Sequence, residues 1–197
     1  MRFPSKFLYL ICLLSMNSWG SDIDCGNNEQ ARALASLILT DDNQQRKELR
    51  CNRLLSQIAV EKAQLMAQSE LVMHNLGGSP NNRLREAGYK LPSYYGASFS
   101  NQVEAIAGGY TDAESVWRAF KRSNDHRQHL LGELPFYLEQ DELGVAFLKD
   151  RETAYVEYWV VYLTKGYSPD QTVVFTAEQI PNKSELILQP YDNHQEQ

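Results

Sequence analysis

Several features that often reveal a function are scarce or absent in this sequence of 197 residues. Basic residues do not predominate: 19 Lys and Arg stand against 25 Asp and Glu, which gives a formal net charge of −6. A nucleic-acid binder needs excess positive charge to neutralise phosphates, so this balance argues against that class. Internal repeats and low-complexity segments are also missing, and the length suits one ordinary domain with short extensions.

Motifs of familiar catalytic chemistry are missing as well. Ser123 precedes His126 by three residues, but no GxSxG elbow surrounds it. No GK[ST] follows the pair Gly108-Gly109, which therefore does not resemble a phosphate-binding loop. The sequence offers no ready-made nucleophile and no phosphate site.

Long hydrophobic runs are rare, and the clearest one lies at residues 7–16. It follows a short segment with two positive charges and precedes Ser18-Trp19-Gly20, where small residues flank a bulky one. This three-part layout is typical of a secretory signal peptide, and the run is too short to span a bilayer. We expect residues 1–20 to be cleaved and the mature protein to be secreted or periplasmic, without spanning a membrane. The alternative is a buried N-terminal helix.

Cysteine is scarce, with three residues in the chain. Cys12 lies in the expected signal peptide, which leaves Cys25 and Cys51. Two cysteines in an oxidising compartment usually pair, and a loop of this length restricts the unfolded chain by about 4 kcal/mol in the entropy model. We therefore predict a Cys25–Cys51 disulfide. Their wide separation and the lack of a CxxC pattern do not fit a zinc site.

Helical periodicity dominates the first part of the chain. The pattern predicts helices over residues 29–39, 44–72 and 82–88. The longest has an apolar arc that should pack on the core. Four of its polar residues are expected to point mostly outward: Glu61, Lys62, Gln64 and Gln68.

A further helix is predicted to begin at Thr111, with Glu114 as the reciprocal partner of this cap. Its inward side should carry Val116, Trp117 and Phe120, and it should end near residues 123–125.

Beyond residue 140 the hydrophobic period changes to two. Residues 143–148 and 155–163 are rich in β-branched and aromatic side chains, and the polar turn 149–153 separates them. This pattern predicts an antiparallel hairpin. Helices followed by an antiparallel sheet indicate the α+β class.

Five short motifs occur in one order: "NRLREAGY" (82–89), "VEAIAGGYTDAESVWRAF" (103–120), "SNDHRQHLL" (123–131), "ELGVAF" (142–147) and "YWVVYL" (158–163). Together they resemble the bacterial branch of the CAP superfamily, which includes cysteine-rich secretory proteins, antigen 5 and pathogenesis-related proteins of class 1 (the SCP-like domain). The resemblance implies a secreted protein with a three-layer α-β-α sandwich around a central antiparallel sheet. It also implies an N-terminal helical extension (21–47), a CAP domain (48–165) and a C-terminal extension (166–197).

The resemblance also implies a central cavity, which in many members is lined by histidines and carboxylates and can bind a divalent metal. His74, Glu104 and His126 stand at the matching positions. The family's "GEN" reads Val103-Glu104-Ala105 here, and its second acid has no match in residues 120–123. Glu157 could replace that acid, or it could face the edge of the sheet near the hairpin turn.

Two histidines and a carboxylate can hold zinc or another divalent metal, with a water in the fourth position. Without a metal, they offer general acid and base groups near neutral pH. They could also form a buried hydrogen-bonded ion pair that joins three segments. His129 follows His126 by three residues, so the two could form a surface metal site, although an exposed helical position is the alternative that we prefer.

The leading functional hypothesis is an extracellular or envelope binding module for a lipid, a cell-wall component or a partner protein. One alternative is a metal-assisted hydrolase that uses His74, Glu104 and His126. Another is a purely structural envelope protein.

Overall fold

The computed structural model describes residues 25–96, 101–167 and 187–188. The expected signal peptide, residues 1–20, lies outside these residues, as does most of the expected C-terminal extension with its apolar residues 172–176.

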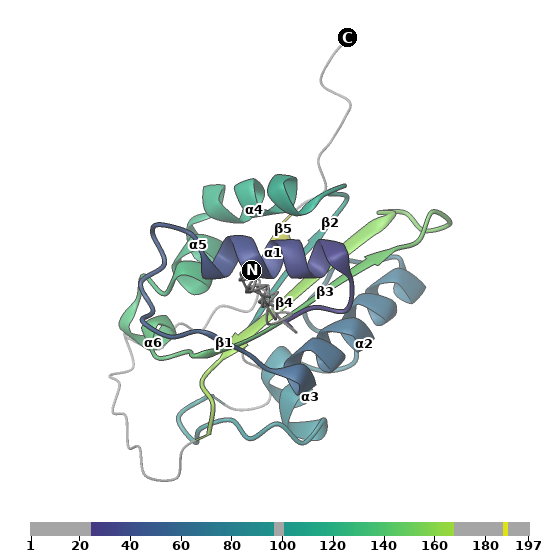
Figure 1. The fold of residues 1–197 in the computed structure, drawn as a ribbon. Helices are drawn as coiled ribbons and strands as arrows, with labels where there is room; N and C mark the ends of the chain where they lie inside the picture. The colour runs from purple at the N-terminus through teal and green to yellow at the C-terminus, as the bar shows by residue number, and fades with distance from the viewer. Residues whose placement is uncertain (1–24, 97–100, 168–186, 189–197) are drawn as a thin grey trace, which may run out of the picture.

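A five-stranded sheet lies between two layers of helices (Figure 1). The strands are β1 (Arg50–Cys51), β2 (Glu104–Gly108), β3 (Glu142–Lys149), β4 (Glu157–Thr164) and β5 (Ile187–Leu188), in the order β1-β3-β4-β2-β5. The helices are α1 (Glu29–Leu39), α2 (Arg53–Ser69), α3 (Pro80–Glu86), α4 (Ala113–Arg122), α5 (Asn124–Leu131) and α6 (Pro135–Leu138).

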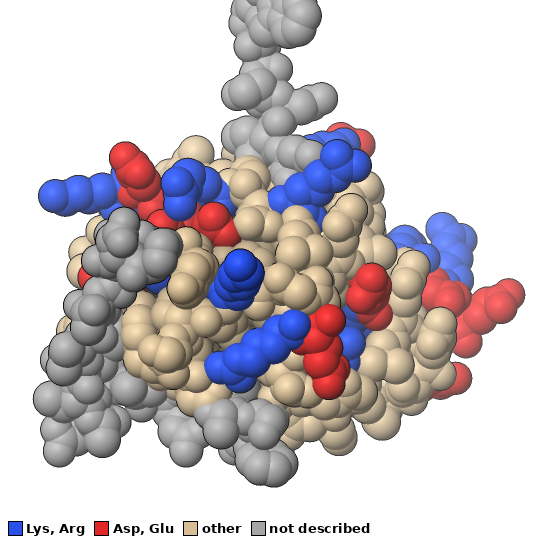
Figure 2. Space-filling view, turned by 90° about the horizontal axis from the view of Figure 1, so that it is seen from below, with Lys and Arg blue, Asp and Glu red and all other residues tan. Residues whose placement is uncertain are grey.

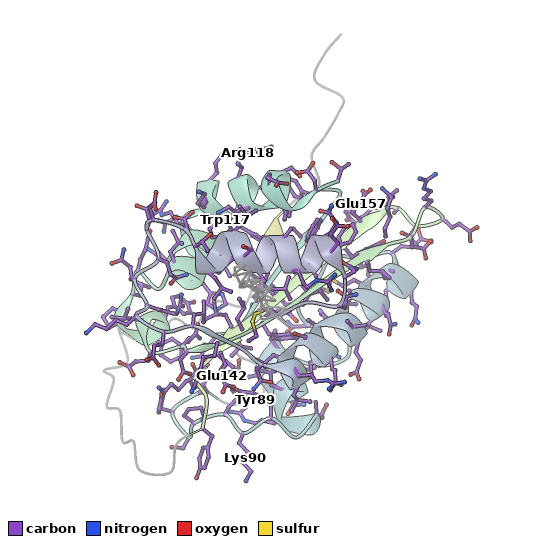
Figure 3. The ribbon with its side chains drawn as sticks, in the orientation of Figure 1. Tyr89, Lys90, Trp117, Arg118, Glu142 and Glu157 are labelled. Atoms are coloured by element: carbon purple, nitrogen blue, oxygen red, sulfur yellow. A yellow bond between two sulfur atoms is a disulfide. The ribbon has the colours of Figure 1, made fainter. Side chains whose placement is uncertain are left out.

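The centre of the sheet is the antiparallel hairpin that the sequence predicts. β3 pairs with β4, and β2 pairs with the other edge of β4, also antiparallel. The two short outer strands differ, because β1 pairs with β3 and β5 pairs with β2 in parallel. In Figure 3, Tyr89 and Glu142 lie near one end of the hairpin, and Glu157 lies at the other.

Side-chain alternation along the strands produces two separate cores. On one face, Trp159, Val161 and Leu163 of β4 pack with α1, α4 and α5 in what we call the first core. On the other face, Tyr158, Val160 and Tyr162 pack with α2, α3 and α6 in the second core. This arrangement confirms the α+β class and the three-layer α-β-α sandwich.

α1 has the bounds that the sequence predicts, because the Asn28 side chain accepts a hydrogen bond from the Ala31 amide and caps its start. The sequence predicts that this helix begins at residue 44, but α2 begins at Arg53, with Asn52 as its cap. The preceding segment is held elsewhere: Gln44 Nε2 donates to the carbonyls of Ile38 and Leu130. These contacts across the first layer compete with helix formation before Asn52.

α4 is capped by Asp112 and not by Thr111, so the predicted cap was wrong by one residue. Asp112 Oδ1 accepts a hydrogen bond of 2.7 Å from the Ser115 amide, and the Thr111 hydroxyl donates to Asp112 Oδ2. The predicted inward face is confirmed, because Val116, Trp117 and Phe120 are buried.

The Cys25–Cys51 disulfide is present, as predicted. It ties the segment before α1 to β1, just before α2 starts. The Cys25 carbonyl also accepts a hydrogen bond from the Val145 amide, so this segment is joined to β3 as well. The disulfide therefore connects the segments that lead into α1 and α2, two helices on opposite sides of the sheet.

α2 approaches the sheet most closely at Gly144 of β3. A Cβ atom at this position would overlap the backbone of Leu55 and Ser56. Glycine at 144 thus allows α2 to lie directly on the strand, which brings the helix within reach of the second core's polar groups.

Candidate functional site

Glu104, the first residue of β2, points toward the second core and is completely buried (0% exposed). Both of its carboxylate oxygens are occupied. His74 Nδ1 lies 2.7 Å from Oε1, and the Tyr162 hydroxyl donates a hydrogen bond of 2.5 Å to Oε2. The sequence prediction that His74 and Glu104 lie together agrees with this contact.

Lys62 of α2 supplies a buried cation beside this pair. Its Nζ lies 4.0 Å from Glu104 Oε1 and donates hydrogen bonds of 2.7 Å to the carbonyls of Met73 and His74. The expectation that Lys62 points outward was therefore wrong. Lys62 is four residues after Ile58 and four before Met66, so it lies on the apolar arc of the helix, a signal that the sequence did contain.

Asn101 completes the cluster by binding the backbone of Glu104. Its Nδ2 donates to the Glu104 carbonyl and its Oδ1 accepts from the Glu104 amide, both at 3.0 Å. The same Nδ2 lies 3.2 Å from His74 Nδ1. We call these five residues the buried cluster: Lys62, His74, Asn101, Glu104 and Tyr162. Sequence reasoning missed Lys62, Asn101 and Tyr162. Lys62 and Tyr162 lie far from Glu104 in the sequence, and no motif marks Asn101, although it is only three residues before Glu104.

The electrostatics of the buried cluster favour an ionised carboxylate. Burial alone would raise the pKa of Glu104, but the charge of Lys62 and the hydrogen bonds from His74 and Tyr162 outweigh it and hold this pKa below its usual value of 4.5. Burial lowers the pKa of Lys62, while Glu104 opposes that shift. For Tyr162, burial and the neighbouring carboxylate raise the pKa well above 10.0. The tyrosine therefore stays protonated and donates to Glu104.

His126 lies in a different part of the fold. It belongs to α5, its Nδ1 is 2.8 Å from Ser123 Oγ, and its ring centroid is 5.0 Å from that of Phe120 in the first core. Glu104 faces the second core instead. Within residues 25–96, 101–167 and 187–188, no three His, Cys, Asp or Glu side chains are grouped so as to hold a metal ion. That finding covers His74, Glu104 and His126.

His129 is completely buried, so the expectation of an exposed helical residue was wrong. Its Nε2 lies 3.3 Å from the Leu163 carbonyl, and its ring centroid is 4.7 Å from that of Tyr137. Burial and the nearby charge of Arg46 lower the pKa of His129 to about 3. α5 packs against the sheet and α6, so this side of the helix is inside the protein rather than on its surface.

Glu157 does not replace the missing acid beside Glu104. It starts β4 and lies on the same side as Trp159 and Val161, which belong to the first core. Lys149 Nζ lies 2.7 Å from Glu157 Oε1, so the carboxylate is paired across the hairpin. The two glutamates therefore belong to opposite faces of the sheet.

No family model matches this sequence, and no curated protein matches it. Two solved structures are similar in fold. One is an outer surface protein from Borrelia burgdorferi, with a TM-score of 0.52 and 20% identity over 68% of this chain and 90% of that chain. The other is an extracellular protein containing an SCP domain from Bacillus anthracis, with a TM-score of 0.52 and 15% identity. That match covers 68% of this chain and 39% of the Bacillus chain. The likeness shows that the fold is SCP-like.

Among the described residues, no helix combines the length and the apolar character that crossing a membrane requires.

Proposed function

We propose that this chain is a secreted bacterial protein of the CAP superfamily that acts as a binding module in the envelope or outside the cell. Its ligand would be a lipid, a cell-wall component or a partner protein. The signal-like N-terminus, the disulfide and the names of the two similar structures, an outer surface protein and an extracellular protein, support this assignment.

The burial of Glu104 and the hydrogen bonds to both of its oxygens are the observation that favours binding over catalysis. A general base or a metal ligand must reach a substrate or a water, directly or through one bridging molecule. Glu104 has no exposed surface, and its oxygens are already engaged by His74 and Tyr162. We infer that the buried cluster joins α2, β2 and β4 and serves the stability of the fold.

Surface charge agrees with a role other than nucleic-acid binding. On the face seen in Figure 2, basic and acidic side chains are interspersed among neutral ones, and no broad patch of one sign stands out. Such a surface suits neutral or zwitterionic partners better than a polyanion.

The substitution Glu104→Gln tests the structural role of the buried cluster. The side chain at position 104 keeps its shape but loses the charge that compensates Lys62. We therefore expect the free energy of unfolding to fall by about 1 to 3 kcal/mol. Thermal unfolding followed by circular dichroism measures this change. Glu152→Gln, in the exposed hairpin turn, is the matched control and should leave the melting temperature unchanged.

Turnover assays test the alternative of a metal-assisted hydrolase. Peptides, esters and cell-wall fragments should be hydrolysed only at background rate, with and without added zinc. Calorimetry should likewise show no stoichiometric zinc binding that His74→Ala or His126→Ala removes. Hydrolysis that disappears in Glu104→Gln, with an unchanged melting temperature, would refute the binding proposal.

A further inference from the structure

An open pocket of about 410 Å³ lies away from the buried cluster, between the segment before β1 and the end of α6. Its charged lining is balanced, with three bases and three acids: Arg46, Lys47, Lys165, Glu48, Glu139 and Asp141. A second open pocket of about 320 Å³ adjoins it, because Leu138 lines both. Leu134 and Pro135 give this second pocket an apolar wall. The two pockets share Gln45 and Leu138, and we call them together the depression: the first pocket is its charged end, and the second, which Glu133 also lines, is its more apolar end.

Arg46 is the unusual member of the charged end. It is only 7% exposed, and its guanidinium donates to neutral oxygens: Nη1 to Gln44 Oε1 and the Leu130 carbonyl, and Nη2 to the His129 carbonyl. Within the described part of the chain, Nε has no hydrogen-bond partner and no carboxylate forms an ion pair with the guanidinium. Burial lowers the pKa of Arg46 to about 9, and the charge of Asp141 opposes that shift only in part, so a bound carboxylate would stabilise the buried cation further.

The acids of the pocket decide which kind of ligand fits. Asp141 is already engaged by Arg50 at 3.0 Å and by the Gly166 amide at 2.8 Å. Glu48 and Glu139 form no ion pair within the described residues. A simple anion would be attracted by Arg46 and repelled by these two acids, whereas a ligand with both charges would satisfy both signs.

We propose that this depression binds a short peptide with free termini. Arg46 would face the terminal carboxylate and Glu139 the ammonium group, while Leu138 and Pro135 would contact an apolar side chain. The proposal rests on the binding role proposed above and names the ligand class. The same chemistry is offered by short peptides released from proteins and by short cell-wall peptides, which differ in the handedness of their terminal residues.

Nuclear magnetic resonance titration of the full-length ¹⁵N-labelled protein with L-alanyl-L-alanine tests the proposal. We expect saturable shifts of amide signals in residues 45–48 and 132–141. The C-terminal amide of the dipeptide should bind at least about tenfold more weakly, because it lacks the charge that faces Arg46. The N-acetyl form should also bind more weakly. D-alanyl-D-alanine, compared with the L form, distinguishes a cell-wall source from a protein source.

Two variants extend the test. Glu139→Gln should weaken the dipeptide but leave binding of its N-acetyl form unchanged, whereas the control Glu152→Gln should change neither. Arg46→Lys keeps the charge but loses the planar fork, so it should weaken binding wherever thermal unfolding shows it to be folded. Equal binding of the free acid and the amide, or no saturable shifts in these segments, would overturn the peptide proposal. A failure of the binding role itself would be seen separately, in the turnover assays.

Discussion

Lys62 and Glu104 show how much a single pair of charges can decide inside this protein. Each is completely buried, and each is compensated chiefly by the other and by neighbouring hydrogen bonds. The sequence allowed His74 and Glu104 to be predicted as neighbours through the family resemblance. Lys62 was missed, because a lysine in a helix is usually exposed and only its place on the apolar arc indicates otherwise.

Replacing Lys62 by methionine keeps most of the length of the side chain but removes the cation. We expect Lys62→Met to lower the free energy of unfolding by about 3 to 5 kcal/mol, because Glu104 then remains buried with less compensation. The double variant with Glu104→Gln should lose less than the sum of the two single losses, by about 1 to 3 kcal/mol. Urea unfolding of the four proteins measures this coupling, and strict additivity would show that the two residues do not interact.

The low pKa of Glu104 makes stability depend on pH. The carboxyl is ionised more readily in the folded than in the unfolded protein, so its contribution is complete above the ordinary value of 4.5 and is lost as the pH falls toward the lower folded value. Between about pH 6 and about pH 3, the native protein should therefore lose more stability than Glu104→Gln. Melting temperatures across this range provide the measurement. Parallel curves for the two proteins would contradict the expectation.

At the scale of elements, local signals predicted the regular structure well where they were strong. Helical periodicity and the alternation of β4 gave α1 and the hairpin correctly. β2 was not predicted as a strand, because all five of its residues are buried and no alternation of polar and apolar side chains marks it. The start of α2 was missed because tertiary contacts of Gln44, rather than local preference, hold the preceding segment.

The turn between β3 and β4 contains a strained position. Val156 has a φ of 62°, in the left-handed region that β-branched residues rarely adopt. Val156→Asn should raise the free energy of unfolding by about 1 kcal/mol, because asparagine tolerates this conformation better. Val60→Asn, the same change inside α2, is the control and should lower it. Chemical unfolding of both variants compares them, and a loss of stability in Val156→Asn would contradict the strain argument.

At the scale of the whole molecule, the disulfide joins the two helical layers at one edge of the sheet. Loss of this cross-link in the double variant Cys25→Ala with Cys51→Ala should lower the free energy of unfolding by about 4 kcal/mol in the entropy model. In thermal unfolding, reductant should cause the same loss of stability in the native protein and no loss in the double variant. A melting temperature that reductant leaves unchanged in the native protein would contradict this.

The pairing of Glu104 with Tyr162 across β2 and β4 also affects which structures the chain avoids. If β2 shifted by one residue, alternation would turn Glu104 to the opposite face, among Trp159, Val161 and Leu163. There the carboxylate would meet hydrocarbon instead of Lys62, at a cost of several kcal/mol. A strand of small, uniformly apolar residues would otherwise slide easily, so one charge in this segment selects a single sheet from several misfolded ones.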